Sequence, residues 1–201
     1  MRDRSLEERG RTLEEEYFRK QDAELLRRAR EEAARAERAA SELAQARALA
    51  AALGLTFDSA PPELQAALRR LSAAGITRDM ALVVELLPAL DVAWQGGVDA
   101  AERDRLLAAA GLGAASQRSM DLIADWCLSR PDPAVFEADL VVLRYRLHAL
   151  PPDERPLLVA RVIGACETVA NAAGGWTGFR RVSAAERRVL QGVREALTAS
   201  E

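Results

Sequence analysis

The sequence predicts an all-α protein: a helical bundle of two related helix–loop–helix halves with a long N-terminal helix. Composition is the first reason, because 49% of the 201 residues are hydrophobic but only 4% are aromatic. An apolar set made mostly of alanine and leucine favours closely packed helices over a sheet. The second reason is that no segment shows sustained polar–apolar alternation with β-branched residues, so we expect no strands. The third is a short phrase that occurs twice.

Each copy of this phrase follows an alanine-rich helical stretch and contains paired glycines, a short polar residue and a glutamate three positions later. The members are Gly96, Gly97, Asp99 and Glu102 in the first copy, and Gly174, Gly175, Ser183 and Glu186 in the second. The glycines can end a helix, because glycine adopts left-handed backbone angles at little cost. The polar residue and the glutamate together form the pattern of a capping box. We therefore predict two helix hairpins about 78 residues apart, which together form an internal repeat.

Start and stop signals divide the chain into three parts. Residues 1–53 are expected to form one long charged helix that ends before Gly54. Residues 54–76 are expected to form a loop and a short linking helix, and residues 77–201 the bundle. The expected later helices span about 62–74, 78–94, 100–110, 116–128, 132–150, 153–173 and 184–199. The second of these is apolar nearly all round, so it should be central.

The N-terminal helix carries 12 basic and 12 acidic residues up to position 52, many spaced to pair along one face. About 50 residues at 1.5 Å each would extend roughly 75 Å, more than a compact domain of this size requires. Its first half also offers the large apolar side chains Tyr17, Phe18 and Leu25. We predict that residues 1–30 contact a protein partner or a second copy of the chain, led by these three side chains.

The second glycine loop contains an insertion that the first lacks. It brings two aromatic and two basic residues together: Trp176, Phe179, Arg180 and Arg181. Such a set resembles a hot spot for partner binding or an anion contact. The alternative is that the aromatic residues anchor the loop on the core while the arginines are solvated.

Several functional classes have little support in the sequence. A net charge of -3 gives no general attraction to nucleic acid or anionic membranes, and no apolar run is long enough to span a bilayer. The sequence contains no nucleotide-binding loop or nucleophile elbow, and no Ser, Cys or Asp is spaced to act as a catalytic partner of His148. We therefore expect that the protein is not an enzyme. Cys127 and Cys166 fall in helical patterns, which favours buried free thiols and a cytoplasmic location.

Metal binding is the main alternative for the glycine turns. Asp99, Glu102 and Glu186 could supply oxygen ligands to a divalent cation. Calcium loops need several clustered acidic oxygens, however, and these two turns contain few. We therefore expect no cofactor, with a divalent cation as the open alternative.

The run from Leu90 to Arg103 resembles the signature of the TerB-like, tellurite-resistance-associated family. In that family an alanine-rich helix ends in an acidic Asp-Gly turn and a glutamate-bearing helix follows. The segment from Cys166 to Leu190 is similar to the second half of the same fold. The segment from Leu13 to Lys20 resembles a helical extension found before such domains in bacterial proteins.

This resemblance implies an all-helical, non-catalytic bundle of two related halves, associated with the stress response and with divalent cations held near the turns. The chain departs from the family at the turn aspartate. Gln95 or Gly96 replaces it in the first copy and Gly174 in the second, so only Glu102 and Glu186 match the family's downstream glutamate.

The sequence thus favours a non-catalytic interaction module that recruits a partner or dimerises through its N-terminal helix. One alternative is a cation-binding protein of the TerB-like type. Another is a regulator whose charged helix inserts into a target enzyme, as small helical ATPase inhibitors do.

Overall fold

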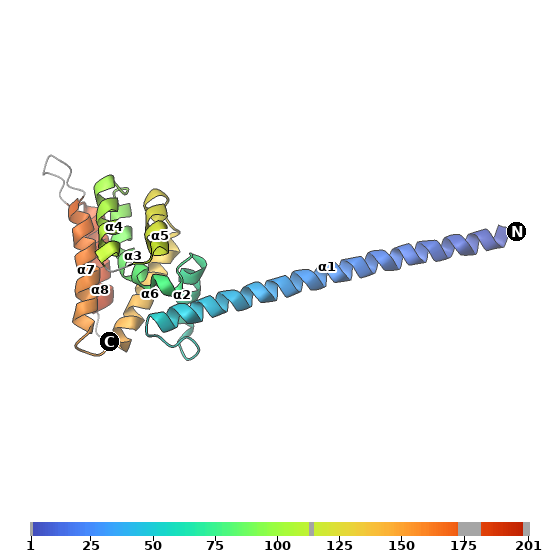
Figure 1. The fold of residues 1–201 in the computed structure, drawn as a ribbon, viewed down its shortest axis with the longest axis horizontal. Coiled ribbons are helices and arrows are strands. Elements are labelled where there is room, and N and C mark those ends of the chain that lie inside the picture. Colours follow the sequence, from blue (N-terminus) through green and yellow to red (C-terminus); the bar gives the residue numbers. More distant parts are fainter. Residues whose placement is uncertain (1, 113–114, 173–181, 199–201) are drawn as a thin grey trace. The chain divides into compact units, whose positions relative to one another are not determined.

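A computed structural model describes residues 2–112, 115–172 and 182–198, with side chains from Arg19 onward except that of Leu112. Over these residues the chain forms eight α-helices and one 3-10 turn, and none of them lies in a strand (Figure 1). The predicted all-α class is therefore confirmed. The elements are α1 (Arg2–Ala52), α2 (Pro62–Ala73), η1 (Arg78–Met80), α3 (Ala81–Trp94), α4 (Ala100–Leu112), α5 (Gln117–Leu128), α6 (Pro133–Ala149), α7 (Arg155–Ala172) and α8 (Ala184–Thr198).

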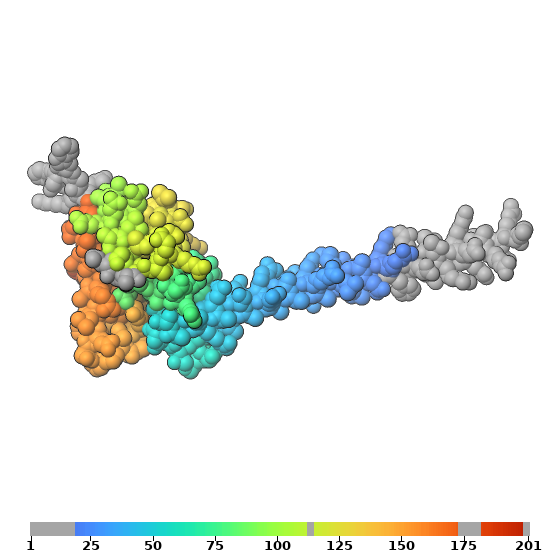
Figure 2. All heavy atoms as spheres, in the orientation of Figure 1, coloured from blue at the N-terminus to red at the C-terminus, as the bar shows by residue number. Residues whose placement is uncertain are grey.

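The chain divides into two units, residues 1–41 and residues 42–201. The first unit is the N-terminal part of α1. From Arg19 to Ser41 every residue is exposed except the half-buried Glu24, and Figure 2 shows these side chains along the surface of the helix. Within this unit, Arg27 pairs with Glu24 at 2.7 Å and with Glu31 at 2.6 Å.

The second unit contains the end of α1 and all the later helices. Here the small stripe of α1 becomes buried, with Ala46, Leu49 and Ala50 fully enclosed in the core. Leu53 follows them into the core, and Gly54 ends the helix with a φ of 73°.

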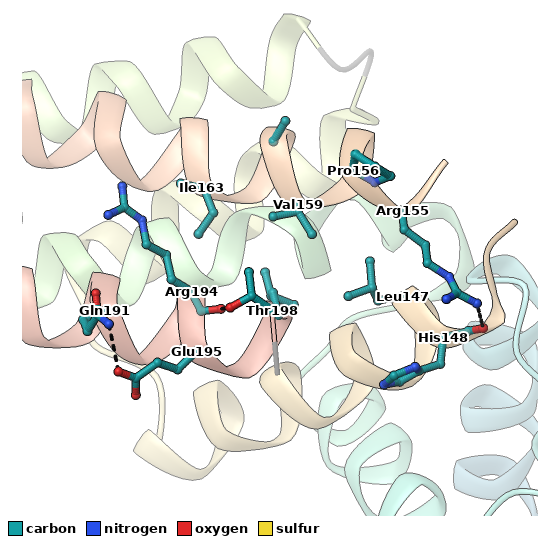
Figure 3. A pocket seen from close by; sticks show the side chains of 12 residues that line it. Leu147, His148, Arg155, Pro156, Val159, Ile163, Gln191, Arg194, Glu195 and Thr198 are labelled. Carbon is teal, nitrogen blue, oxygen red and sulfur yellow. Dashed lines mark hydrogen bonds between the residues drawn. The ribbon is translucent and has the colours of Figure 1, made fainter. Parts of the chain in front are cut away.

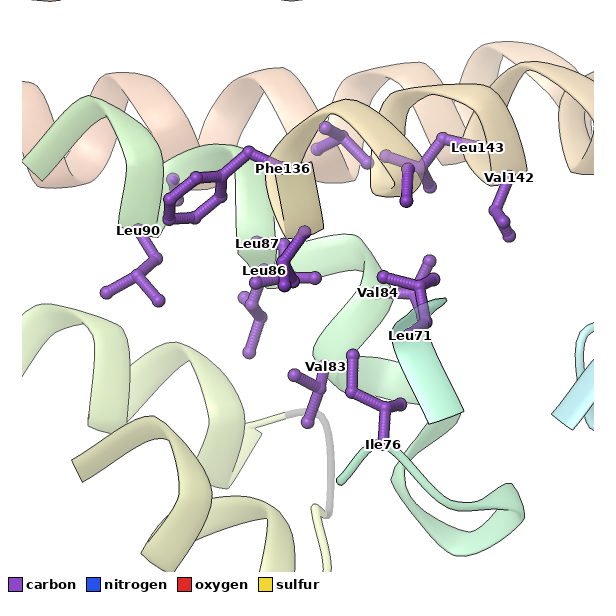
Figure 4. Packing of buried hydrophobic residues seen from close by; sticks show 14 of the residues in the cluster. Leu71, Ile76, Val83, Val84, Leu86, Leu87, Leu90, Phe136, Val142 and Leu143 are labelled. Carbon is purple, nitrogen blue, oxygen red and sulfur yellow. The ribbon is translucent and has the colours of Figure 1, made fainter. Parts of the chain in front are cut away.

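Helix α3 is the centre of this second unit, as its continuous apolar sequence predicts. All residues from Val83 to Leu90 are buried. The helix lies along α7 and also contacts α4, α5, α6 and α8, while α2 packs on α6. Figure 4 shows side chains of α3 meeting Phe136 and Leu143 of α6.

The start of this central helix differs from the prediction. Residues 78–80 form the 3-10 turn η1, and the α-helix begins only at Ala81. Thr77 directly precedes this turn but gives no side-chain cap bond. Its hydroxyl instead donates to the carboxylate of Asp79, which takes it away from the helix amides.

Candidate functional site

The first glycine turn joins α3 to α4 and contains the predicted capping box. The amide of Glu102 donates to Oδ1 of Asp99 at 2.8 Å, and the amide of Asp99 donates to Oε2 of Glu102 at 2.9 Å. Gly97 adopts a φ of 81° before the box, a conformation that favours glycine. Glu102 is only 1% exposed, so this box is part of the interior.

The second box, at the start of α8, has the same reciprocal form. The amide of Ser183 donates to Oε2 of Glu186 at 2.8 Å, and the amide of Glu186 donates to the Ser183 hydroxyl at 3.1 Å. Glu186 is also buried. Both boxes were predicted from the sequence and both are confirmed.

The first glycine turn and the second capping box, far apart in the sequence, meet in the fold. A Cβ atom placed on Gly96, at the end of α3, would lie 3.2 Å from Oε1 of Glu186. This agrees with the helix packing, in which α4 contacts α7 and α8 contacts α3. Sequence reasoning missed this meeting, because the capping pattern is local and carries no information about which turns adjoin.

The three acidic residues considered as metal ligands form hydrogen bonds within these capping boxes. Asp99, Glu102 and Glu186 each accept a backbone amide hydrogen bond through one side-chain oxygen. Among the described residues, no three His, Cys, Asp or Glu side chains are grouped so that they could hold a metal ion. The geometry therefore assigns these carboxylates to helix capping.

The partner-binding candidates are described only in part. Leu25 lies on α1 and is 60% exposed, and its neighbour Leu26 is 58% exposed. Tyr17 and Phe18 lie within the backbone of α1, but their side chains fall outside the described residues. The loop candidates Trp176, Phe179, Arg180 and Arg181 also lie outside the described residues.

A small cavity between α3, α6 and α8 contains two acidic side chains that sequence reasoning missed. It has a volume of about 210 Å³ and is lined by Asp91 of α3 and Asp139 of α6. Asp139 is 1% exposed, and neither of its carboxylate oxygens has a hydrogen-bond partner in the described chain. Burial, together with the nearby charge of Asp91, raises the pKa of Asp139 well above its usual value.

Asp91 differs from Asp139 because it has donors. Its Oδ1 accepts hydrogen bonds from the side chains of Gln95 and Arg130, each at 3.2 Å. Burial raises the pKa of Asp91, and the contacts from Arg130 and Gln95 oppose that rise. A signal for the pair was present in the sequence: Asp139 lies three residues after Phe136 and four before Leu143, so it interrupts the apolar stripe of α6.

A second, larger hollow of about 780 Å³ lies between α6, α7 and α8 (Figure 3). Its floor is apolar, with Leu147 and Ile163 among the lining residues. At its rim the Arg155 guanidinium donates to the backbone oxygens of His148 and Leu150, at 3.1 and 3.0 Å. The backbone at the end of α6 therefore takes up donors of the Arg155 guanidinium.

An ionic network around the buried carboxylate of Glu85 joins three helices on another side of α3. Glu85 is 7% exposed and accepts hydrogen bonds from Arg146 of α6 at 2.7 Å and from Arg161 of α7 at 2.8 Å. Burial raises the pKa of Glu85, but the two arginines outweigh it, so the pKa lies below its usual value. This network fixes α3, α6 and α7 relative to one another and does not face the 210 Å³ cavity.

Both cysteines are free and buried, as expected. Burial is the main cause that raises the pKa of Cys127 to about 11 and that of Cys166 to about 12. Neither thiol has the lowered pKa of a reactive cysteine. None of the helices described here is both long enough and apolar enough to cross a membrane.

Comparison of the chain with models of protein families, with curated proteins and with solved structures gives no match.

Proposed function

We propose that the chain is a non-catalytic helical interaction module that binds another protein chain through the N-terminal part of α1. The exposure of residues 19–41 carries this proposal. Over this stretch no residue is buried, and Leu25 and Leu26 each expose more than half of their surface. Adjacent exposed leucines on a helix are typical of a segment that docks on a partner.

The energetics of helices support the same conclusion. A helix draws most of its stability from packing an apolar face against something, and exposed ion pairs such as those of Arg27 with Glu24 and Glu31 add little. A partner chain or a second copy that covers Leu25 would supply this packing. The larger anchors Tyr17 and Phe18, about two helical turns before Leu25, would extend the same contact.

We also propose that the second unit is a TerB-like bundle acting in the cytoplasmic stress response. The two capping boxes after glycine turns support this assignment, as does the packing of the α3–α4 pair on α7 and of the α7–α8 pair on α3. A net charge of -3 disfavours nucleic acid as the partner.

The test replaces Tyr17, Phe18 and Leu25 together with alanine. We expect the triple variant to lose association. Sedimentation-equilibrium ultracentrifugation measures self-association, and affinity capture with mass spectrometry detects binding of another protein. Leu157→Ala is the matched control, because Leu157 is 58% exposed on α7, outside the proposed contact. The triple variant should melt cooperatively at nearly the wild-type temperature.

Two results would contradict the proposal. One is a triple variant that associates as well as the wild type. The other is a triple variant whose second unit unfolds, which would mean that these side chains support the fold.

A further inference from the structure

Asp139 is a buried acidic group to which the described residues supply no hydrogen-bond partner. Asp139 lines the 210 Å³ cavity, and its carboxylate receives no hydrogen bond from the described chain. Buried polar groups in folded proteins are almost always paired, and an unpaired carboxylate is among the most costly exceptions. An orphaned carboxylate at a cavity wall therefore points to a ligand that carries hydrogen-bond donors.

Helix α8 borders the cavity partly with a glycine. Gly192 lies in the interior of this helix, is exposed, and lines the cavity. A Cβ atom placed on Gly192 would meet nothing within 4 Å. Glycine is less favourable than alanine inside a helix, so its presence here leaves space at a cost in helix stability. The missing side chain therefore leaves space on the α8 side of the cavity that a larger residue would fill.

The size of the cavity restricts the ligand. An apolar cavity of about 150 Å³ engineered into another protein binds benzene. The cavity at Asp139, at about 210 Å³, therefore suits a ligand of similar size with one added polar group.

The lining defines the chemistry of that ligand. The walls are apolar, formed by Pro88, Phe136, Leu140, Val189 and Val193, and the two polar side chains that line the cavity are carboxylates. Carboxylates accept hydrogen bonds and attract positive charge, so the complementary ligand is a cation with N–H donors on an apolar body.

A divalent metal ion fits this lining poorly. Calcium takes six to eight oxygen ligands, and magnesium requires near-octahedral coordination. The cavity offers two carboxylates, and Asp91 already accepts from Arg130 and Gln95. The described residues also contain no group of three side chains suited to a metal.

We propose that this cavity binds a small primary ammonium ion, with its nitrogen at Asp139 and its apolar part against Phe136, Leu140 and Val193. This site is separate from the α1 contact proposed above and does not depend on it. Without the ligand, burial keeps the Asp139 carboxyl protonated over a wider pH range than an exposed aspartate. A neutral amine entering the cavity takes that proton and becomes the ammonium partner of the carboxylate, so charge and protons balance.

The experiment titrates the full chain with benzylamine and with benzyl alcohol, its neutral isostere, by isothermal calorimetry. We expect saturable binding of benzylamine, at least tenfold tighter than that of the alcohol. Asp139→Asn should weaken benzylamine binding at least tenfold, because it keeps the size of the side chain but removes the charge. Circular dichroism checks that this variant is folded.

A second variant tests the cavity itself. Gly192→Leu should fill it and abolish benzylamine binding, whereas Gly164→Leu should leave binding unchanged. Gly164 is a matched control, because it also lies inside a helix and has nothing within 4 Å of its Cβ position. If Asp139→Asn does not fold, the comparison of benzylamine binding by Gly192→Leu and Gly164→Leu tests the proposal.

Several results would overturn the proposal. They are the absence of benzylamine binding, equal affinity for the amine and the alcohol, or undiminished binding in Asp139→Asn or in Gly192→Leu. Stabilisation of the chain by calcium or magnesium alone, lost in Asp139→Asn, would replace the ammonium site with a metal site.

Discussion

Removing the helix caps tests the most detailed geometry that the sequence predicted. Asp99→Ala and Ser183→Ala each delete the side chain that accepts the amide of the third residue of its helix. Loss of such a cap costs about 1 kcal/mol of folding free energy. Asp99 should matter more, because its acceptor is a carboxylate at 2.8 Å whereas the Ser183 hydroxyl lies at 3.1 Å. A negative charge at a helix N-terminus adds about 0.3–1 kcal/mol.

We therefore expect a cost of about 1.5 kcal/mol for Asp99→Ala and about 1 kcal/mol for Ser183→Ala. For a chain of this length, each kcal/mol lowers the melting temperature by about 2–4 °C. Urea unfolding, followed by circular dichroism, measures the free energy of unfolding of each variant. Asp104→Ala is the control, because Asp104 lies on α4 beyond the box and its side chain is 71% exposed.

The reasoning on charge fails if Ser183→Ala costs more than Asp99→Ala. The assignment of these residues to capping fails if either variant keeps full stability but loses partner binding.

Three further predictions concern buried groups. Burial raises the pKa of Asp139, so its protonated form contributes stability that is fully present below the usual aspartate pKa and is lost as the pH rises through the raised pKa. Asp139→Asn should therefore raise the urea midpoint of unfolding at pH 8 and change it little at pH 3. Arg146→Met should cost about 1–3 kcal/mol by removing one donor from the buried carboxylate of Glu85, measured as a lower free energy of unfolding. With pKa values of about 11 and about 12, Cys127 and Cys166 should react slowly with iodoacetamide at pH 8 in the native protein and rapidly in denaturant. Mass spectrometry measures the extent of labelling, and rapid labelling of the native protein would contradict their burial.

The features that the sequence predicted well are those whose causes are local. The linking helix was expected at 62–74 and spans Pro62–Ala73, because a proline favours its first turn and Gly75 follows its end. Both capping boxes depend on residues three positions apart, so spacing alone identified them.

The features that the sequence missed depend on which helices are neighbours. The closeness of Gly96 to Glu186 arises from packing between segments that share no local pattern. Asp139 could be seen to interrupt an apolar stripe, but the cavity beside it requires the positions of α3 and α8 as well. Spacing rules describe one helix at a time and cannot supply these positions.

The contact between Gly96 and Glu186 of the second capping box also bears on how the second unit folds. Helix α3 packs on α7 and α8, and α7 packs on α3 and α4, so each helix pair completes the apolar surface of the other. To form such contacts, long stretches of chain must lose conformational entropy before apolar burial stabilises them, which slows folding and makes it all-or-none. A chain cut between α4 and α5 should therefore give two fragments that remain largely unfolded when separate and regain helical structure when mixed.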